Sequence, residues 1–133
     1  MNTDYYLEQV LNNHLLKHAP ELFGDQPYCF QQDSAPAHKS KKTQSWCRDN
    51  LPDFIGTEEW PAASSDLNPL DYFMWGHMLS KIGSTKSLTV DQFKALLEQI
   101  WDEIPDEPVR ASCNAFFKRL RRVIREKGER FEL

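Results

Sequence analysis

Strand-like segments are scarce in this 133-residue chain, and their scarcity limits the folds that it can adopt. Only residues 28–32 and 53–56 have the composition of short β-strands. Helical apolar patterns occupy residues 3–19, 36–50, 69–82, 90–104 and 105–127. Because an isolated pair of strands is only marginally stable in water, these two segments do not make a self-sufficient sheet. The sequence therefore predicts an α/β chain with an incomplete sheet half and a helix-rich C-terminal half.

Capping and stop signals mark the ends of the predicted helices. Proline suits the first helical position, where its missing amide donor is not needed, and glycine suits the end of a helix. The expected terminators are Pro20 and Gly128, the expected first residues are Pro36, Pro69 and Pro105, and the expected caps are Asn68 and the Thr89/Gln92 pair. The apolar stripes of the last two helices are interpreted as core.

Composition excludes several classes of protein. Hydrophobic residues make up 40% of the chain and charged residues 27%, which is typical of globular domains. No apolar run reaches the roughly 20 residues of a membrane span, and the start lacks the layout of a secretory signal. The three cysteines are widely spaced, which argues against a disulfide framework or a cysteine zinc site. We expect an intracellular protein without a membrane partner.

Positive charge is concentrated in two places, although the net charge is -4. Residues 110–130 contain eight Lys and Arg residues against two Glu residues, and Arg119 and Arg122 lie among them. Lys39, Lys41 and Lys42 form a second basic cluster. Such patches can bind phosphates even on acidic proteins, although a solvated helix face is the favoured explanation when no further motif is considered. These five cations are candidate contacts for DNA phosphates.

Two aspartates are candidates for metal chemistry. Asp33 follows the first predicted strand, and Asp71 lies in the first turn of a helix. Two carboxylates brought together suit Mg²⁺, and such ions catalyse phosphoryl transfer. The alternatives are an Asx turn at Asp33 and a helix-dipole partner at Asp71. His38 is a candidate to line the same pocket and orient a metal-binding carboxylate, or else a plain helix-surface residue. Asn68 is a candidate for the same supporting role beside its capping role.

Two motifs surround these acids. Residues 31–38 read Gln-Gln-Asp-Ser-Ala-Pro-Ala-His, and residues 60–72 read Trp-Pro-Ala-Ala-Ser-Ser-Asp-Leu-Asn-Pro-Leu-Asp-Tyr. They resemble the segments that carry the second and third acids of mariner-type transposases of the DDE/D superfamily. The 37 residues between Asp33 and Asp71 resemble a longer-spacer subgroup with Asp as the third acid. Residues 119–131 resemble the family's C-terminal helix and its ending, so the resemblance covers essentially the whole chain.

The resemblance implies the C-terminal part of an RNase H-like catalytic domain. It places the strands of the first aspartate and a helix-turn-helix domain upstream of residue 1, because neither Asp4 nor Asp25 follows a strand in the right context. Residues 1–133 are thus interpreted as a truncated catalytic domain. Ser65 stands where the family usually has proline. Proline would rigidify that loop.

The implied function is a fragment of a cut-and-paste DNA transposase, with Asp33 and Asp71 as catalytic, metal-binding residues. The intact family enzyme uses Mg²⁺ or Mn²⁺ and binds transposon ends in the nucleus. A homodimer is a possible state of the protein. Metal binding and cleavage by this chain alone are expected to be weak or absent, because positioning dominates phosphoryl transfer. The alternatives are a non-catalytic nucleic-acid or protein-binding module derived from a transposase and, less favoured, an unrelated Mg²⁺ hydrolase.

Overall fold

The structure is a computed structural model that describes residues 1–83 and 88–127. The chain divides into two compact units, Met1–Ser64 and Ser65–Leu133, and each is described by itself. No helix in the described part of the chain combines the length and apolar character needed to cross a membrane.

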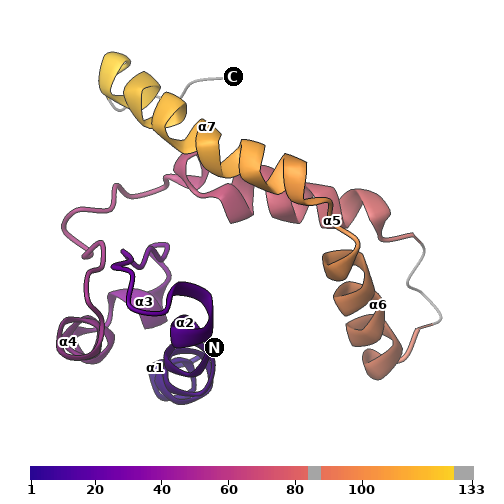
Figure 1. Ribbon diagram of the computed structural model, residues 1–133, viewed down its shortest axis with the longest axis horizontal. Coiled ribbons are helices and arrows are strands. Elements are labelled where there is room, and N and C mark those ends of the chain that lie inside the picture. The colour runs from indigo at the N-terminus through magenta and orange to yellow at the C-terminus, as the bar shows by residue number, and fades with distance from the viewer. Residues whose placement is uncertain (84–87, 128–133) are drawn as a thin grey trace. The chain divides into compact units, whose positions relative to one another are not determined.

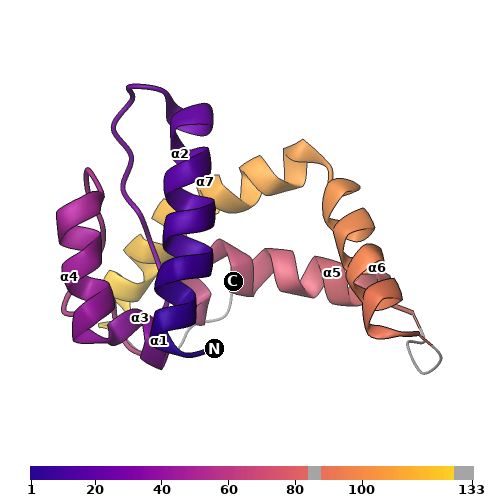
Figure 2. The ribbon, with the colours of Figure 1, turned by 90° about the horizontal axis from the view of Figure 1, so that it is seen from below.

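The N-terminal unit begins with one long helical rod, seen end-on in Figure 1 and side-on in Figure 2. It consists of α1 (Thr3–Tyr5), η1 (Tyr6–Leu15), which is π-helical, and α2 (Leu16–Phe23). The Asn2 side chain caps the start by accepting the Tyr5 amide at 2.8 Å. The prediction that Pro20 stops the helix is wrong, because Pro20 lies inside α2. The rod ends instead at Gly24, whose positive φ of 55° turns the chain and is readily adopted by glycine.

The predicted helix over residues 36–50 is in fact two helices, α3 (Pro36–Lys39) and α4 (Lys41–Asn50). Pro36 opens α3 as expected. The break is at Ser40, whose extended ψ of 142° interrupts the helical path. Ser40 Oγ then caps α4 by accepting the Thr43 amide at 3.2 Å. The serine thus competes successfully with helix continuation, as short hydroxyl side chains do.

The two predicted strands meet over a single residue pair. Phe30 and Phe54 form an isolated parallel bridge, in which the Phe30 amide donates to the Asp53 carbonyl and the Ile55 amide to the Phe30 carbonyl, each at 3.0 Å. No longer strand is present among residues 1–83 and 88–127. The expectation of two full strands is therefore wrong, although the two segments do pair. A ladder needs further paired strands to be stable, and the described part of the chain supplies none.

The core of the N-terminal unit lies between the helical rod and α4, which run side by side in both ribbon views (Figures 1 and 2). Leu11 and Cys47 are completely buried there. The Trp46 indole donates to the Asn12 side chain at 3.2 Å across the same contact. Phe30 and Phe54 pack against the edge of this core, so the paired segments are anchored to it.

The C-terminal unit is helical. Its elements are η2 (Ser65–Leu67), a 3₁₀ turn, η3 (Leu70–Met74), which is π-helical, α5 (Trp75–Lys81), α6 (Val90–Asp102) and α7 (Asp106–Arg125). The Thr89/Gln92 capping box opens α6 as predicted. Pro105 immediately precedes α7, and the predicted terminator Gly128 lies outside the described residues, as does Ser84 of the predicted break after α5.

The apolar stripes of α6 and α7 are only partly covered. Ile100 is buried, but Val90, Phe117 and Ile124 are exposed at 71%, 64% and 69%. The interpretation of these stripes as core is therefore wrong for much of their length. Helical periodicity shows which face is apolar, but burial also requires a partner surface.

Candidate functional site

Asp33 stands at the end of the extended segment and just before α3. Its Oδ1 accepts the Ala35 amide at 2.9 Å, which is the Asx turn that the sequence offers as an alternative. The Asp33 side chain is 49% exposed. Both contacts that the structure gives this carboxylate use Oδ1. The turn therefore orients the carboxylate and leaves Oδ2 available to a further partner.

His38 reaches back from α3 to the same carboxylate. Its Nδ1 lies 2.6 Å from Asp33 Oδ1 and donates to it in the Nδ1-protonated tautomer. The imidazole packs on the ring of Tyr6, with the centroids 4.3 Å apart. Tyr6 in turn donates its hydroxyl to Gln32 Oε1 at 2.8 Å. Burial, with smaller contributions from Cys47 and Asp33, raises the pKa of Tyr6 well above its ordinary value, so this phenol remains protonated and a donor.

Asp71 is the second residue of η3 and is exposed. The Asn68 side chain accepts the Leu70 amide at 3.1 Å, and the Asn68 carbonyl accepts the Asp71 amide at 2.9 Å. The predicted cap is confirmed, and it fixes the backbone that carries Asp71. Among the described residues, no hydrogen bond joins the Asn68 side chain to the Asp71 carboxylate.

The donor set for a divalent ion is incomplete within each unit. Carboxylate oxygens are the ligands that Mg²⁺ and Mn²⁺ prefer. Asp33 belongs to the first unit and Asp71 to the second. Within residues 1–83 and 88–127, no group of three His, Cys, Asp or Glu side chains is arranged to hold a metal ion. The acids are thus of the right kind for such an ion, but they do not make a complete site.

Arg119 fastens α7 to the segment that carries Asp71. Its guanidinium lies 3.8 Å from the centroid of the Tyr72 ring, a cation–π distance, and it donates to the Asp66 carbonyl at 3.2 Å. Tyr72 donates its hydroxyl to the Ser112 carbonyl of α7 at 2.6 Å. We call Arg119, Tyr72 and Ser112 the α7 clamp. Arg119, a predicted phosphate contact, has a structural role here.

The remaining cations of α7 form a local basic surface. Lys118, Arg121, Arg122 and Arg125 line a shallow cavity of about 230 Å³. Arg122 Nε is also 3.5 Å from Glu126 Oε1, one helical turn away. The predicted phosphate contact Arg122 is therefore partly neutralised by its own helix.

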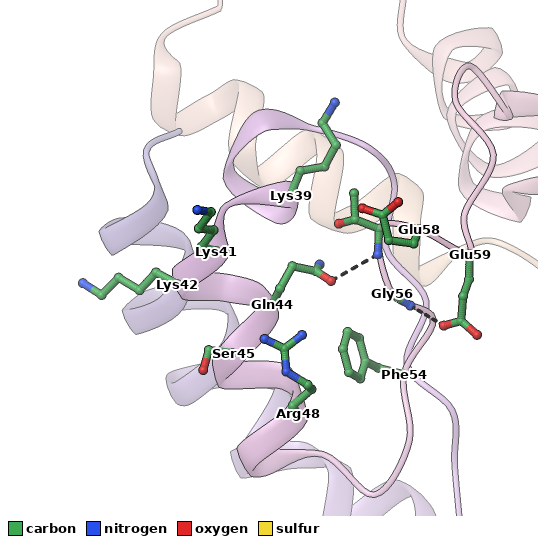
Figure 3. Close-up of a pocket in the computed structure, with 11 residues that line it drawn as sticks. Lys39, Lys41, Lys42, Gln44, Ser45, Arg48, Phe54, Gly56, Glu58 and Glu59 are labelled. Atoms are coloured by element: carbon green, nitrogen blue, oxygen red, sulfur yellow. Dashed lines mark hydrogen bonds between the residues drawn. The ribbon is translucent and has the colours of Figure 1, made fainter.

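The three basic residues near Asp33 differ in their surroundings. Lys39 and Lys41 line a groove of about 1090 Å³ beside α4, which Figure 3 shows in close-up. Lys42 lines it too, but forms an ion pair with Asp4. Lys39 also lines the small hollow that contains Asp33.

Several residues at these sites were not recognised from the sequence. Tyr6 and Gln32 support the His38–Asp33 pair, and Tyr72 lies in the α7 clamp. Strand alternation offers a signal for Gln32, because the neighbour of an exposed strand residue points to the opposite, buried face. Tyr6 and Tyr72 look like ordinary aromatic members of helical stripes, and only the tertiary fold shows their polar partners.

Sequence comparison finds relatives of this chain among transposases. No protein-family model matches the chain. It is 31% identical to the Tcb1 transposase of Caenorhabditis briggsae over 124 residues, covering 93% of this chain and 44% of that protein. It is 30% identical to the Tc3 transposase of Caenorhabditis elegans over 129 residues, covering 96% of this chain and 37% of that one. The chain thus spans less than half of the relatives that it matches.

Solved structures show the same fold. The catalytic domain of the Mos1 mariner transposase matches with a TM-score of 0.76 at 23% identity, over 98% of this chain and 64% of that one. The Mos1 paired end complex with Mn matches with a TM-score of 0.82 at 20% identity, over 99% and 38%. The RNase H-like class expected from the motifs agrees with this match, which adds the fold to the sequence relationship. The chain is a homologue of the Tc1/mariner transposases, folded like part of the Mos1 catalytic domain.

Proposed function

We propose that this chain is the part of a cut-and-paste DNA transposase catalytic domain that carries its second and third metal-binding carboxylates, Asp33 and Asp71. The observation that carries the proposal is the homology to transposases over 93% of the chain. The local geometry supports it, because the Asx turn and His38 orient Asp33 through one oxygen and leave the other available. The longer spacer and the Asp at position 71 are the basis for assigning the chain to the subgroup with Asp as third acid.

The cofactor in the intact enzyme would be Mg²⁺ or Mn²⁺, and the partner would be DNA at the transposon ends, in the nucleus. Related Mos1 catalytic-domain structures were determined with Mn and with Mg. When bound, such an ion activates a water or hydroxyl and stabilises the leaving oxygen. The residues of this chain would bind the ion through Asp33 and Asp71, and His38 would hold the Asp33 carboxylate in one orientation.

Metal titration tests the assignment of the two acids. We expect Asp33→Asn and Asp71→Asn each to weaken Mn²⁺ binding, measured by electron paramagnetic resonance, by about tenfold or more. Asp49→Asn and Asp91→Asn, which remove the same charge from exposed sites in each unit, serve as matched controls. Equal effects of all four substitutions would contradict a specific site.

A DNA-nicking assay tests the expected catalytic incompleteness. With supercoiled plasmid and Mg²⁺, the chain alone should show little or no nicking above buffer, because two carboxylates position metal ions poorly for phosphoryl transfer. Nicking that disappears in Asp33→Ala would show that the chain is a complete nuclease and overturn this expectation.

The alternative of a non-catalytic binding module is distinguished by the metal titration. A module that retains only a binding surface would bind nucleic acid but would lose no Mn²⁺ affinity on substitution of Asp33 or Asp71. The basic groove beside α4 favours nucleic acid over protein as the partner of such a module.

A further inference from the structure

We propose that the groove beside α4 binds a single nucleic-acid strand, with the phosphates along α4 and the bases toward the opposite wall. The groove is formed by α4, with Lys39 just before it, and by residues 54–59 (Figure 3). The inference deepens the proposed function by naming where a DNA strand lies, and it rests on that function only for the choice of DNA. Binding itself needs neither a metal ion nor Asp71.

The α4 wall carries the cations. Lys41, Gln44 and Arg48 are spaced three and four residues apart, so they lie on one face of the helix, and all three line the groove. Lys39, Lys41 and Arg48 are exposed and form no ion pair within residues 1–83 and 88–127. Their charges are therefore available to a ligand, in contrast to that of Lys42. Arg48 lies outside the predicted basic cluster and is a new candidate phosphate contact.

The opposite wall is acidic and held in place. The Gly56 amide donates to Glu59 Oε2 at 2.9 Å, which holds the turn of this wall, and the Thr57 amide donates to Gln44 Oε1 at 3.1 Å, which ties the wall to α4 (Figure 3). Glu58 and Glu59 are exposed on this wall. A carboxylate here can accept hydrogen bonds from the amino groups of bases.

Phe54 lies between the two walls. Its ring is half-buried, packs against the core of the unit and lines the groove beside Arg48. Aromatic side chains stack on bases of any sequence, which is the usual contact in single-strand binding. The three parts of the groove match the three parts of one nucleic-acid strand. The cationic wall suits the phosphates, the aromatic ring suits the base faces, and the acidic wall suits the amino groups on the base edges.

This asymmetry disfavours other polyanions. A duplex carries phosphates on both of its edges, and an acidic peptide carries carboxylates on either side of its backbone. Each would bring negative charge against Glu58 and Glu59, which is unfavourable. A single strand has its charge on one edge only, so it can satisfy both walls.

The groove adjoins the hollow that contains Asp33. The hollow that contains Asp33 shares Lys39, Gln44, Gly56 and Thr57 with the groove. A strand in the groove would therefore lie beside the hollow that holds this carboxylate. Phosphates held by Lys41 and Arg48 would set the distance between the bound strand and Asp33.

Fluorescence anisotropy tests the groove. The full chain, in EDTA, is titrated into a fluorescein-labelled oligodeoxynucleotide of about 20 unpaired nucleotides, at several salt concentrations between about 50 and 200 mM. The groove variant is Lys41→Gln/Arg48→Gln. The matched control is Lys17→Gln/Arg110→Gln, which removes the same two charges from exposed positions that do not line the groove.

We expect the groove variant to bind about tenfold or more weakly, and its salt dependence to lose about one to two units of slope. The control should stay within about twofold of the parent. Phe54→Leu should weaken binding about fivefold with the slope unchanged, and Phe54→Trp should restore it, which separates stacking from folding defects. Thermal melts of each variant verify that it is folded.

Three results would overturn the proposal: no binding by the parent, equal losses in the groove variant and the control, or equally tight binding of a duplex or a poly-glutamate peptide. EDTA removes divalent ions, so this assay does not depend on metal binding. A negative result would therefore contradict the groove without affecting the conclusion from the metal titration of Asp33 and Asp71. Binding in the groove combined with equal Mn²⁺ effects of the Asp33 and Asp71 substitutions and their two controls would contradict a specific metal site and retain the groove.

Discussion

Single side chains explain how the segment carrying Asp71 is held in place. Tyr72, the next residue, contacts α7 twice, through its hydroxyl to Ser112 and through its ring to Arg119. A basic residue in a cationic helix is easily interpreted as a phosphate contact. At Arg119 the guanidinium packs on an aromatic ring and donates to the Asp66 carbonyl, so it has a structural role as well. Arginine suits this role because its planar group can stack and donate at once.

The α7 clamp should contribute measurably to stability. We expect Arg119→Lys to lower the free energy of unfolding by about 1–2 kcal/mol, because lysine loses both the stacking geometry and the bond to Asp66. Tyr72→Phe should cost about 0.5–1.5 kcal/mol by removing the bond to Ser112. Urea titrations measure both, with Arg121→Lys, on an exposed position of α7, as the control. Indistinguishable values for Arg119→Lys and Arg121→Lys would show that the clamp contributes nothing.

Cys47 should make the chain less stable at alkaline pH. Burial, opposed by the charge of Arg48, raises the pKa of the Cys47 thiol from 9.0 to about 11. Because the folded thiol holds its proton more tightly than the unfolded one, its contribution is complete below about pH 9. It is lost between about pH 9 and 11, and the loss is on the order of 1–3 kcal/mol.

Urea titrations at pH 8 and pH 10.5 test this linkage. The loss of stability between the two pH values should be smaller in Cys47→Ala than in the parent. Cys113→Ala removes an exposed thiol and should keep the full loss. Tyr6 and Cys29 also have raised pKa values, so a residual decline remains in Cys47→Ala. A decline as steep as that of the parent would contradict the role of Cys47.

At the level of elements, helix ends were predictable wherever the signal was local. Pro36, Asn68 and the Thr89/Gln92 box act as expected, because each involves hydrogen bonds or backbone angles within about one turn. Two other predictions about helix ends were wrong: that the first helix stops at Pro20, and that residues 36–50 form one continuous helix. At Ser40 a side-chain cap overrides the helical pattern, and at Pro20 the helix continues for another turn up to Gly24.

The 3₁₀ turn η2 offers a test of the departure from the family at Ser65. Ser65 is the exposed first residue of η2. The φ of a 3₁₀-helix, about −60° in general, is one that proline also adopts. We expect Ser65→Pro to raise the free energy of unfolding by about 0.4–1 kcal/mol, by restricting the unfolded chain. Ser64→Pro is the matched control and should destabilise, because it removes the 2.7 Å bond from Ser64 Oγ to the Pro61 carbonyl. Destabilisation by both substitutions would show that position 65 cannot adopt the family's residue.

Burial is unevenly distributed over the whole molecule. The first unit has fully buried side chains in both of its long helical elements, including Leu11, Thr43 and Cys47. In the second unit, α6 has one buried residue, Ile100, and leaves Val90 and Trp101 exposed. Apolar contacts are the main source of local stability, so the two units should differ in how often they open.

Hydrogen–deuterium exchange measures this difference. Amides in the middle of α4 should exchange about tenfold or more slowly than those in the middle of α6, which corresponds to a difference in opening free energy on the order of 1–2 kcal/mol. Both helices are measured in a single sample at one pH, so the solution conditions that set the intrinsic exchange rates are the same for both. Equal protection in the two helices would indicate that the exposed stripe of α6 is covered in solution.

The sequence by itself determined what depends on near neighbours: the two acid motifs, the helices, most caps and the resemblance that the comparisons support. Local hydrogen bonds and side-chain spacing act over a few residues, so the amino-acid sequence is enough to predict these features. The tertiary structure decided which residues surround each acid, that the strands pair over one bridge, that Arg119 packs on Tyr72, and that α4 faces an acidic wall. Those contacts join residues far apart in the chain, and they depend on which apolar surfaces find a partner.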